Sequence, residues 1–242
     1  MLESKTEVLL LLPYFDYLDE GLLVFGVLFG SLLTALVTGI ALHEASHAFT
    51  ADRLGDGTAR LMGRVTLNPL RHLDPAGSIL LLIVGFGWGK PVPVNPMRLR
   101  HGPEAGRAMV AAAGPLMNLL IAVLAALPFQ LGLIEWDLVG PIEDWGAKQY
   151  ASLYLGSLIV INVLLAVFNL LPIAPLDGFS VAVGILPRDM SRSFARMEKY
   201  GLMILMLLIM LPYLSNDQIP GLWTVMGPVV EGLTDIIVGE DA

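Results

Sequence analysis

Two histidines four residues apart, with a glutamate beside the first, are the side chains in this sequence best suited to chemistry. His43, Glu44 and His47 form the pattern H-E-x-x-H. On a helix, residues i and i+4 share one face, so both imidazoles can reach one divalent ion while the glutamate contacts a metal-bound water. The alternative is that these are three ordinary helix residues that happen to stand in this order. Their position inside an otherwise uncharged stretch disfavours this alternative. The pattern therefore predicts a metal site with a general base beside it.

Asp177 is the candidate for a third ligand, because a catalytic zinc site usually takes three protein ligands and one open position. His43 lies nine residues before Asp52, and Asp177 lies eleven before Arg188. If the intervening residues are helical, both side chains therefore lie roughly 13–17 Å from the cytoplasmic boundary of the membrane. Neighbouring helix breakers would let the carboxylate turn toward a cavity; they are Pro172, Pro175 and Gly178. An ordinary turn residue in Pro-Leu-Asp-Gly is the alternative.

The charge of such a site also fits an apolar setting. A zinc ion, two neutral imidazoles, one carboxylate and one hydroxide sum to zero, and a neutral cluster is what a low-dielectric site tolerates. The released proton would then be held by Glu44.

The composition places these residues in a membrane protein. Of 242 residues, 55% are apolar and 15% are charged, against about 25% charged in ordinary globular chains, and the mean hydropathy is +0.72. These values exclude a disordered chain and a nucleic-acid binder with a basic face. The absence of cysteine excludes a disulfide-stapled secreted domain. Without internal repeats or low-complexity linkers, residues 1–242 are expected to form a single membrane-embedded domain.

Four stretches can provide membrane spans, each of which needs about 20 apolar residues. They are residues 21–51 with H-E-x-x-H, 105–134, 149–187 with a break around Asp177, and 199–216. Residues 75–89 are also uncharged, but their apolar core is too short to cross. We therefore expect an all-α polytopic membrane protein with about four full transmembrane helices. A re-entrant or β-hairpin segment over 58–100 would lie between the first and the second.

Basic residues predict the orientation, because Lys and Arg concentrate in cytoplasmic loops. Twelve of the 14 fall in three loops, within 53–71, 90–107 and 188–199. We expect a multi-pass protein of the cell membrane with its active site toward the cytoplasmic side. Residues 1–20 are expected as an outer interfacial segment rather than a cleavable signal peptide, and 217–242 as an outer tail.

In these motifs the chain resembles the site-2 protease family of intramembrane zinc metalloproteases, in its compact form without PDZ or CBS domains. The resemblance runs from about Gly39 to Leu186 and rests on ordered motifs: HEASH at 43–47, NPLRHLDPAGS at 68–78, GWGKPVPVNP at 87–96, AGPLMN at 113–118 and NLLPIAPLDG at 169–178. Family members often carry Gly and a basic residue where this chain has Phe179-Ser180. That departure weakens only the subfamily placement.

The resemblance implies one Zn²⁺ per chain, bound by His43, His47 and Asp177, with Glu44 as catalytic base. It also implies cleavage of a transmembrane protein substrate within or near the bilayer, as in regulated intramembrane proteolysis. Asn118 in the second span would be a candidate oxyanion donor, with an interhelical hydrogen bond as the alternative.

The remaining polar residues have plainer interpretations. Asn162 and Asn169 are expected to support packing or to hold the residues around the ligands, and His72 and His101 are expected to lie in loops and not to be ligands. The β-prone segments 64–67 and 91–94 could form a hairpin whose edge pairs with an unwound substrate. A lipid-facing loop without a substrate role is the alternative.

Two other functions stay open at this point. A zinc or cation transporter also places His and Asp in broken helices, but it gives Glu44 no task and the sequence shows no related halves. A catalytically silent member acting as a binding protein would have no need of this base. The expected partners are a transmembrane protein substrate and the lipid bilayer, with no nucleic acid, and a homo-oligomer stays open.

Overall fold

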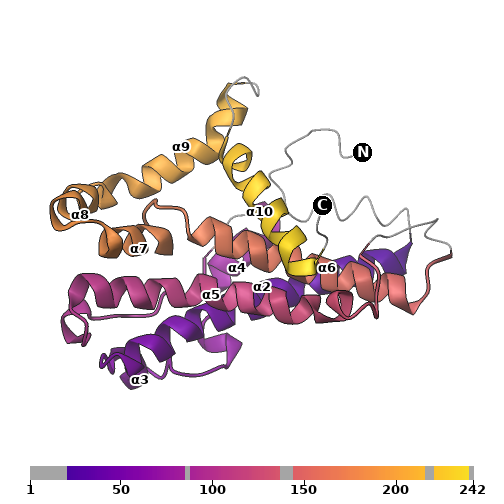
Figure 1. Ribbon diagram of the computed structural model, residues 1–242, viewed down its shortest axis with the longest axis horizontal. Helices are drawn as coiled ribbons and strands as arrows, with labels where there is room; N and C mark the ends of the chain where they lie inside the picture. Colours follow the sequence, from indigo (N-terminus) through magenta and orange to yellow (C-terminus); the bar gives the residue numbers. More distant parts are fainter. Residues whose placement is uncertain (1–20, 85–87, 137–143, 216–220, 240–242) are drawn as a thin grey trace.

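A computed structural model describes residues 21–84, 88–136, 144–215 and 221–239 (Figure 1). Over these ranges the regular elements are helices, joined by one isolated β-bridge and no strand. The α-helices are α2 (Leu22–Arg53), α3 (Thr58–Leu61), α4 (Pro75–Val84), α5 (Pro103–Gln130), α6 (Ala147–Asn169), α7 (Asp177–Ile185), α8 (Arg188–Ala195), α9 (Gly201–Leu214) and α10 (Leu222–Val238). Short 3₁₀ turns are η1 (Pro69–Arg71), η2 (Pro96–Arg98) and η4 (Glu198–Tyr200). The predicted all-α class is confirmed.

Three helices, α2, α5 and α6, are long and apolar enough to cross a membrane. A helix satisfies every backbone N–H and C=O within its own segment, which an apolar stretch in lipid requires. The three helices pack against one another in pairs, and Figure 1 shows them side by side along the long axis. The predicted fourth span corresponds to α9, whose 14 residues are fewer than the about 20 that a crossing needs. A fourth crossing therefore stays a prediction.

Helix α10 completes the apolar core between α5 and α6. Its Met226 and Val230 are buried in one cluster with Ala126 of α5 and Ile159 of α6. The side-chain amide of Gln130 donates to the carbonyl of Ile237 over 2.7 Å, which ties the ends of α5 and α10. The sequence analysis predicted only an outer tail here, because Pro228 and the acidic residues Glu231 and Asp235 interrupt the apolar pattern.

The third predicted span is broken in the structure between Asn169 and Asp177. Helix α6 ends at Asn169 and α7 begins at Asp177, with a tight turn between them. Gly178 is in close contact with the end of α6, since a Cβ there would lie 2.1 Å from the carbonyl oxygen of Leu170. The turn places α7 against α5, so that its first residue, Asp177, faces α2.

The region between α2 and α5 contains α4 and a single bridge between Leu73 and Gly89, with no strand over residues 64–67 or 91–94. The predicted hairpin of those two segments is therefore absent from this structure. A buried side chain joins them instead: the guanidinium of Arg64 donates to the carbonyls of Arg71, Lys90 and Pro91. A guanidinium carries five donors, which lets it replace a ladder of backbone hydrogen bonds.

A buried carboxylate, that of Asp56, holds the segment between α2 and α5 in place near the end of α2. Asp56 is fully buried and accepts hydrogen bonds from the backbone N–H of Thr58 and the backbone N–H of Asn95. Burial alone would raise the pKa of Asp56, but these hydrogen bonds and that from the Thr58 hydroxyl hold it below its ordinary value. The predicted outer segment 1–20 lies outside the described residues.

The contact between α5 and α7 gives a testable prediction. A Cβ at Gly184 would lie 2.3 Å from the Cβ of Ala108 and 2.9 Å from the carbonyl oxygen of Glu104. We expect Gly184→Ala to push these helices apart and to reduce stability by about 1–3 kcal/mol. The apparent unfolding temperature in nanodiscs, measured by intrinsic fluorescence at one scan rate, would fall by several degrees.

The matched control is Gly232→Ala on α10, where an added Cβ meets nothing within 4 Å. It should leave the unfolding temperature unchanged or raise it, since Ala is the better helix former. Equal unfolding temperatures for the two variants would contradict the described contact.

Candidate metal centre

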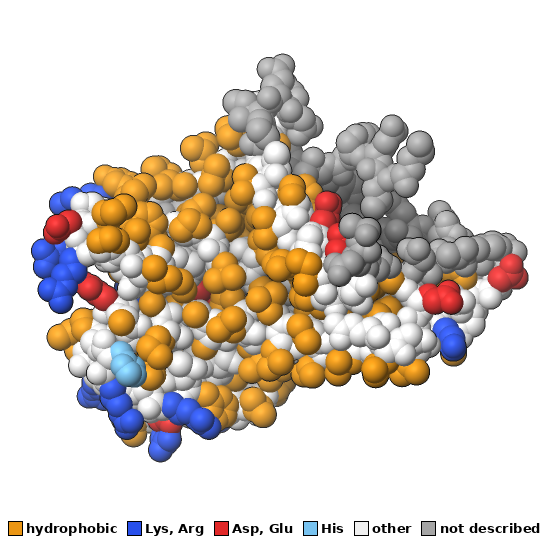
Figure 2. Space-filling view, viewed as in Figure 1, with side chains coloured by type: hydrophobic (Ala, Val, Ile, Leu, Met, Phe, Trp, Pro, Cys, Tyr) orange, Lys and Arg blue, Asp and Glu red, His pale blue; other side chains and the backbone are white. Residues whose placement is uncertain are grey.

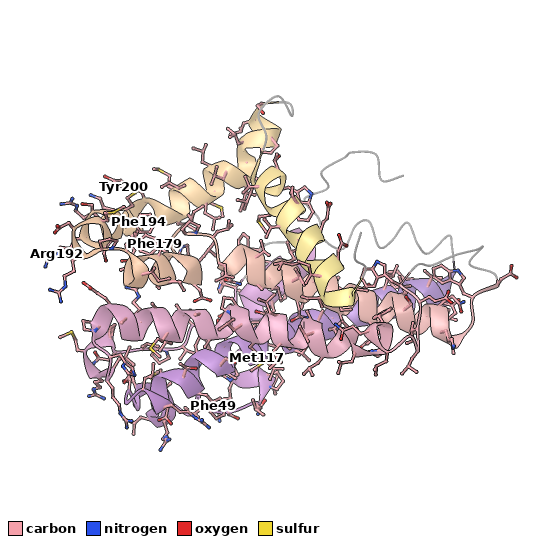
Figure 3. The ribbon with its side chains drawn as sticks, viewed as in Figure 1. Phe49, Met117, Phe179, Arg192, Phe194 and Tyr200 are labelled. Atoms are coloured by element: carbon pink, nitrogen blue, oxygen red, sulfur yellow. The ribbon has the colours of Figure 1, made fainter. Side chains whose placement is uncertain are left out.

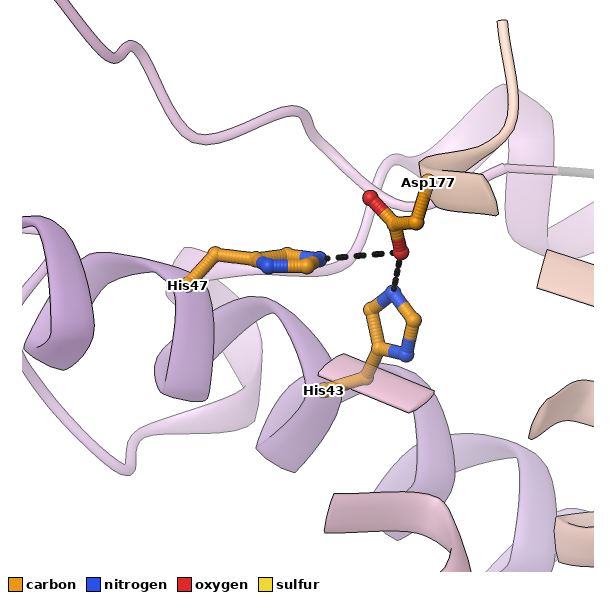
Figure 4. Close-up of side chains that lie close together, drawn as sticks. All are labelled: His43, His47 and Asp177. Carbon is orange, nitrogen blue, oxygen red and sulfur yellow. Dashed lines mark ion pairs between the residues drawn. The ribbon is translucent and has the colours of Figure 1, made fainter. Parts of the chain in front are cut away.

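The two histidines of H-E-x-x-H lie one turn apart on α2 and face the same side (Figure 4). His43 and His47 are buried, with 7% and 8% of their surface exposed. Their rings meet edge to face, with centroids 4.6 Å apart. This arrangement follows from the spacing of four residues on a helix, because both side chains lean toward the preceding turn.

Asp177, the first residue of α7, brings its carboxylate to both imidazoles (Figure 4). Its Oδ2 atom lies 3.0 Å from Nε2 of His43 and 3.2 Å from Nε2 of His47. One donor atom from each of the three residues lies within 4.8 Å of the others, so the group could hold a metal ion. The structure thus brings together the three residues that the sequence analysis selected as ligands.

The second nitrogen of each imidazole fixes its protonation pattern. Nδ1 of His47 is 2.7 Å from the backbone carbonyl of Val110, which can only accept, so this nitrogen carries the proton. Nδ1 of His43 is 2.7 Å from Oδ1 of Asn118. The amide nitrogen of Asn118 faces the carbonyl of Gly39 over 3.1 Å, which assigns Oδ1 as the acceptor from His43.

With Nδ1 protonated in both rings, a neutral imidazole directs an Nε2 lone pair toward Asp177, whereas an imidazolium directs an N–H there. Oδ2 of Asp177 is itself buried, and within the described ranges it accepts no hydrogen bond. Three lone pairs that face one another in an apolar setting repel, so either the imidazoles take up protons or a cation lies between them. Two nitrogens and one carboxylate oxygen are a ligand set that zinc accepts.

Asn118 is occupied by hydrogen bonds within the protein. It is fully buried, and its amide group donates to the carbonyl of Gly39 and to Oδ1 of Asn162, each over 3.1 Å. Asn162 is held in turn by its own donation to the carbonyl of Leu158 over 2.9 Å. In this arrangement Asn118 has no amide hydrogen free for an oxyanion, and the contacts match the alternative of an interhelical hydrogen bond.

Gly114 of α5 is a site residue that the sequence analysis did not select. A Cβ at this position would lie 2.6 Å from Nε2 of His43 and 2.6 Å from Cε1 of His47. Helix α5 can therefore lie directly against both imidazoles only where it carries a glycine. The residue stands in the AGPLMN motif at 113–118, but a search for polar side chains cannot detect a purely steric requirement.

Glu44 lies on the next position of α2, beside His43 and against the segment that follows α4. A Cβ at Gly89 would lie 3.2 Å from both Cγ and Oε1 of Glu44. The backbone of Gly89 is kept in place by the bridge to Leu73, and the N–H of Lys90 donates to the carbonyl of His72 over 2.6 Å. A glycine is therefore the neighbour that leaves room for this carboxylate.

The other two histidines lie away from this group. His72 is buried in the connection, with its Nε2 atom 2.8 Å from the carbonyl of Thr66, and burial lowers its pKa. His101 is exposed just before α5. Neither belongs to the group of potential ligands within the described residues. Asn169 donates to the carbonyl of Leu165 on its own helix.

The close approach of α5 generates a second prediction. Gly114→Ala should displace the imidazoles and lower the affinity of the chain for a divalent ion by about 10- to 100-fold, the range typical of groups that orient metal ligands. The measurement is competition with a chromogenic chelator. Gly30→Ala on α2, where a Cβ meets nothing within 4 Å, is the control and should bind as the unchanged chain does. Unchanged affinity in Gly114→Ala would show that α5 does not constrain the imidazoles.

Comparisons with known proteins identify a family and several relatives. The model of peptidase family M50 matches residues 137–212. The chain is similar to "Putative zinc metalloprotease YwhC" of Bacillus subtilis, with 36% identity over 75% of this chain and 80% of the relative. It is also similar to "Putative zinc metalloprotease Rip2" of Mycolicibacterium smegmatis, with 32% identity over 76% of this chain and 68% of the relative. The Rip2 protein of Mycobacterium tuberculosis is 30% identical over 80% of this chain and 72% of the relative. No solved structure matches the chain significantly.

Proposed function

The chain belongs to peptidase family M50 and is a multi-pass membrane zinc metalloprotease. We propose that it hydrolyses a peptide bond in the transmembrane segment of another membrane protein. One observation carries this proposal. His43, His47 and Asp177 meet between helices whose long stretches are uncharged, with Nε2 of both imidazoles facing Oδ2 of Asp177. Ionisable groups in such stretches are costly and mark functional sites.

We assign the zinc ligands to Nε2 of His43, Nε2 of His47 and Oδ2 of Asp177. A tetrahedral ion with bonds of about 2.0–2.1 Å keeps its ligand atoms roughly 3.3 Å apart, and the two nitrogen-to-oxygen distances here are 3.0 and 3.2 Å. The fit also explains why Oδ2 is buried without a hydrogen bond in the described part of the chain. When bound, zinc supplies a nucleophilic water at neutral pH and polarises the scissile carbonyl.

Glu44 acts as general base and acid in this proposal. Its carboxylate takes the proton of the attacking water and delivers it to the nitrogen of the leaving amide, which could not depart as an anion. The residue follows His43 on the same helix, so it lies beside the ligands without competing for the ion. Gly89 borders the carboxylate, and its small size leaves space on the side from which a peptide bond could approach.

Asn118 and the carbonyl of Val110 act as positioning groups. Each accepts a hydrogen bond from Nδ1–H of one histidine. This hydrogen bond fixes the orientation of the ring and directs Nε2 toward the ion. Asn162 holds Asn118 in turn. These contacts support the proposal that Asn118 orients His43 rather than donates to an oxyanion.

The substrate and the location follow from the same arrangement. A helical peptide bond is already hydrogen-bonded and shielded, so a transmembrane helix must unwind locally to reach the ion, as regulated intramembrane proteolysis requires. Basic residues lie in the connections next to the site, which favours an active site toward the cytoplasmic side of the cell membrane. One zinc ion per chain suffices for this chemistry.

Glu44→Gln provides the test of the proposed chemistry. It keeps the size of the side chain and removes the base, so peptide cleavage should fall by about 10²- to 10⁴-fold while zinc binding stays unchanged. Cleavage of a transmembrane peptide library in proteoliposomes would be followed by mass spectrometry, with and without a chelator. Ser46→Ala is a matched control on the same helix, because among the described residues the Ser46 hydroxyl bonds only to the carbonyl of Leu42. Chelator-resistant cleavage, or zinc flux that persists in Glu44→Gln, would refute a metalloprotease and favour a transporter.

The assigned positioning role of Asn118 makes a separate prediction. Asn118→Ala should weaken zinc binding by about 10- to 100-fold, because His43 loses the acceptor that orients it. Asn169→Ala removes an amide that bonds only within α6 and serves as control. The apparent affinity for zinc is the measurement, and the unfolding temperature of the metal-free protein separates a loss of fold from a loss of orientation. If Asn118→Ala binds zinc with wild-type affinity, Asn118 does not position His43.

A further inference from the structure

Helix α8 and turn η4 carry a row of basic side chains between two apolar helices. Arg188, Arg192 and Arg196 recur every four residues, which places them on one side of the helix. Lys199 continues the row in η4, and all four side chains are exposed. Figure 2 shows Lys and Arg side chains gathered at the end of the molecule where α8 lies.

These positive charges are not neutralised within the described residues. None of the four forms an ion pair with a carboxylate there. Two acidic residues lie in the same segment: Asp189 of α8 forms no ion pair within the described residues, and Glu198 of η4 pairs with Arg107 of α5 over 3.3 Å. The row therefore offers positive charge to something outside this chain.

The neighbouring surface is apolar, which indicates where this partner lies. Met190 and Met197 belong to the same segment, with 58% and 46% of their surface exposed. Helix α7 precedes α8 and packs on α5, and the strongly apolar α9 follows it. A short helix with a basic side and exposed apolar side chains, placed between two apolar helices, is typical of the interface between lipid headgroups and acyl chains.

We propose that α8 and η4 form a binding surface for the phosphate headgroups of anionic phospholipids. Guanidinium groups bind phosphate oxygens in a bidentate manner, and a membrane with anionic lipid presents phosphate groups at its surface. Met190 and Met197 would lie among the acyl chains. Lipid binding at this surface does not depend on whether the chain cleaves peptides.

Contacts between α8 and α7 connect this surface to the catalytic centre. The hydroxyl of Ser191 donates to the carbonyl of Val183 over 2.7 Å. Phe194 of α8 stacks on Phe179 of α7, with centroids 5.0 Å apart, and Figure 3 shows the two rings between these helices. Phe179 stands two residues after Asp177. Anionic lipid that holds α8 therefore also steadies α7 and its first residue, a consequence that rests on the zinc site proposed above.

Lipid selectivity of the full chain tests the surface directly. The protein is reconstituted in phosphatidylcholine bilayers with a trace of spin-labelled phosphatidylglycerol or spin-labelled phosphatidylcholine, and the motionally restricted fraction is measured by electron paramagnetic resonance. We expect at least a threefold preference for phosphatidylglycerol, reduced by high salt. The triple variant R188Q/R192Q/R196Q should lose this preference. The control R71Q/R98Q/R100Q removes three exposed arginines of the same end and should retain it.

Four outcomes would overturn the proposal. An unchanged preference in the α8 variant would exclude this surface, and an equal loss in both triple variants would indicate only a diffuse effect of charge. Inorganic phosphate at matched ionic strength should not displace the labelled lipid, and displacement would assign the site to free phosphate instead. Displacement by an acidic peptide would assign it to a protein partner.

Amide hydrogen exchange tests the connection to α7 without any measurement of cleavage. Peptides covering Asp177–Ile185 should exchange at least threefold more slowly in nanodiscs with phosphatidylglycerol than in phosphatidylcholine alone. The difference should vanish in R188Q/R192Q/R196Q and persist in R71Q/R98Q/R100Q. Equal exchange in the two lipids would overturn the proposed connection between α8 and α7. If the exchange difference between the lipids is present but no peptide is cleaved, only the proposed cleavage of transmembrane segments is contradicted.

Discussion

Three atoms that can bind a metal ion converge in an apolar region, and this is the constraint on which the rest of the structure depends. Val110 and Asn118 each accept a hydrogen bond from Nδ1 of one histidine, so the opposite nitrogen of each neutral ring would present a lone pair to the carboxylate of Asp177. Such an arrangement is unfavourable in a low-dielectric setting unless a positive charge compensates it. The hydrogen bonds from Nδ1 of both histidines therefore orient the two rings as the binding of a cation requires.

The helices meet this constraint through close approach at glycine. Gly114 lets α5 lie against both imidazoles, and Gly178 lets α7 begin directly beside the end of α6. Larger side chains at these positions would separate helices that jointly supply the ligands, since packed interiors leave little room for added atoms. The asparagines of α5 and α6 complete the arrangement by linking both helices to α2 through His43 and Gly39.

The sequence predicted the meeting of His43, His47 and Asp177 because ionisable groups in uncharged stretches need partners, and few were available. It could not reveal Gly114 or the carbonyl of Val110, whose roles are steric and backbone-based and leave no signature in polarity. Helix α10 was missed because acidic residues and Pro228 interrupt its apolar pattern. The expected hairpin is not confirmed: the described residues show no strand over 64–67 or 91–94, and the Arg64 side chain hydrogen-bonds to the carbonyls of Arg71, Lys90 and Pro91.

The order of the ligands along the chain has a consequence for biosynthesis. Both histidines belong to α2, whereas Asp177 opens α7, after α5 and α6. Because the chain is synthesised from the amino terminus onward, both histidines and α5 are made before Asp177. In the proposed zinc site the carboxylate is therefore the last ligand to be made, and a nascent chain stopped before α7 would lack it.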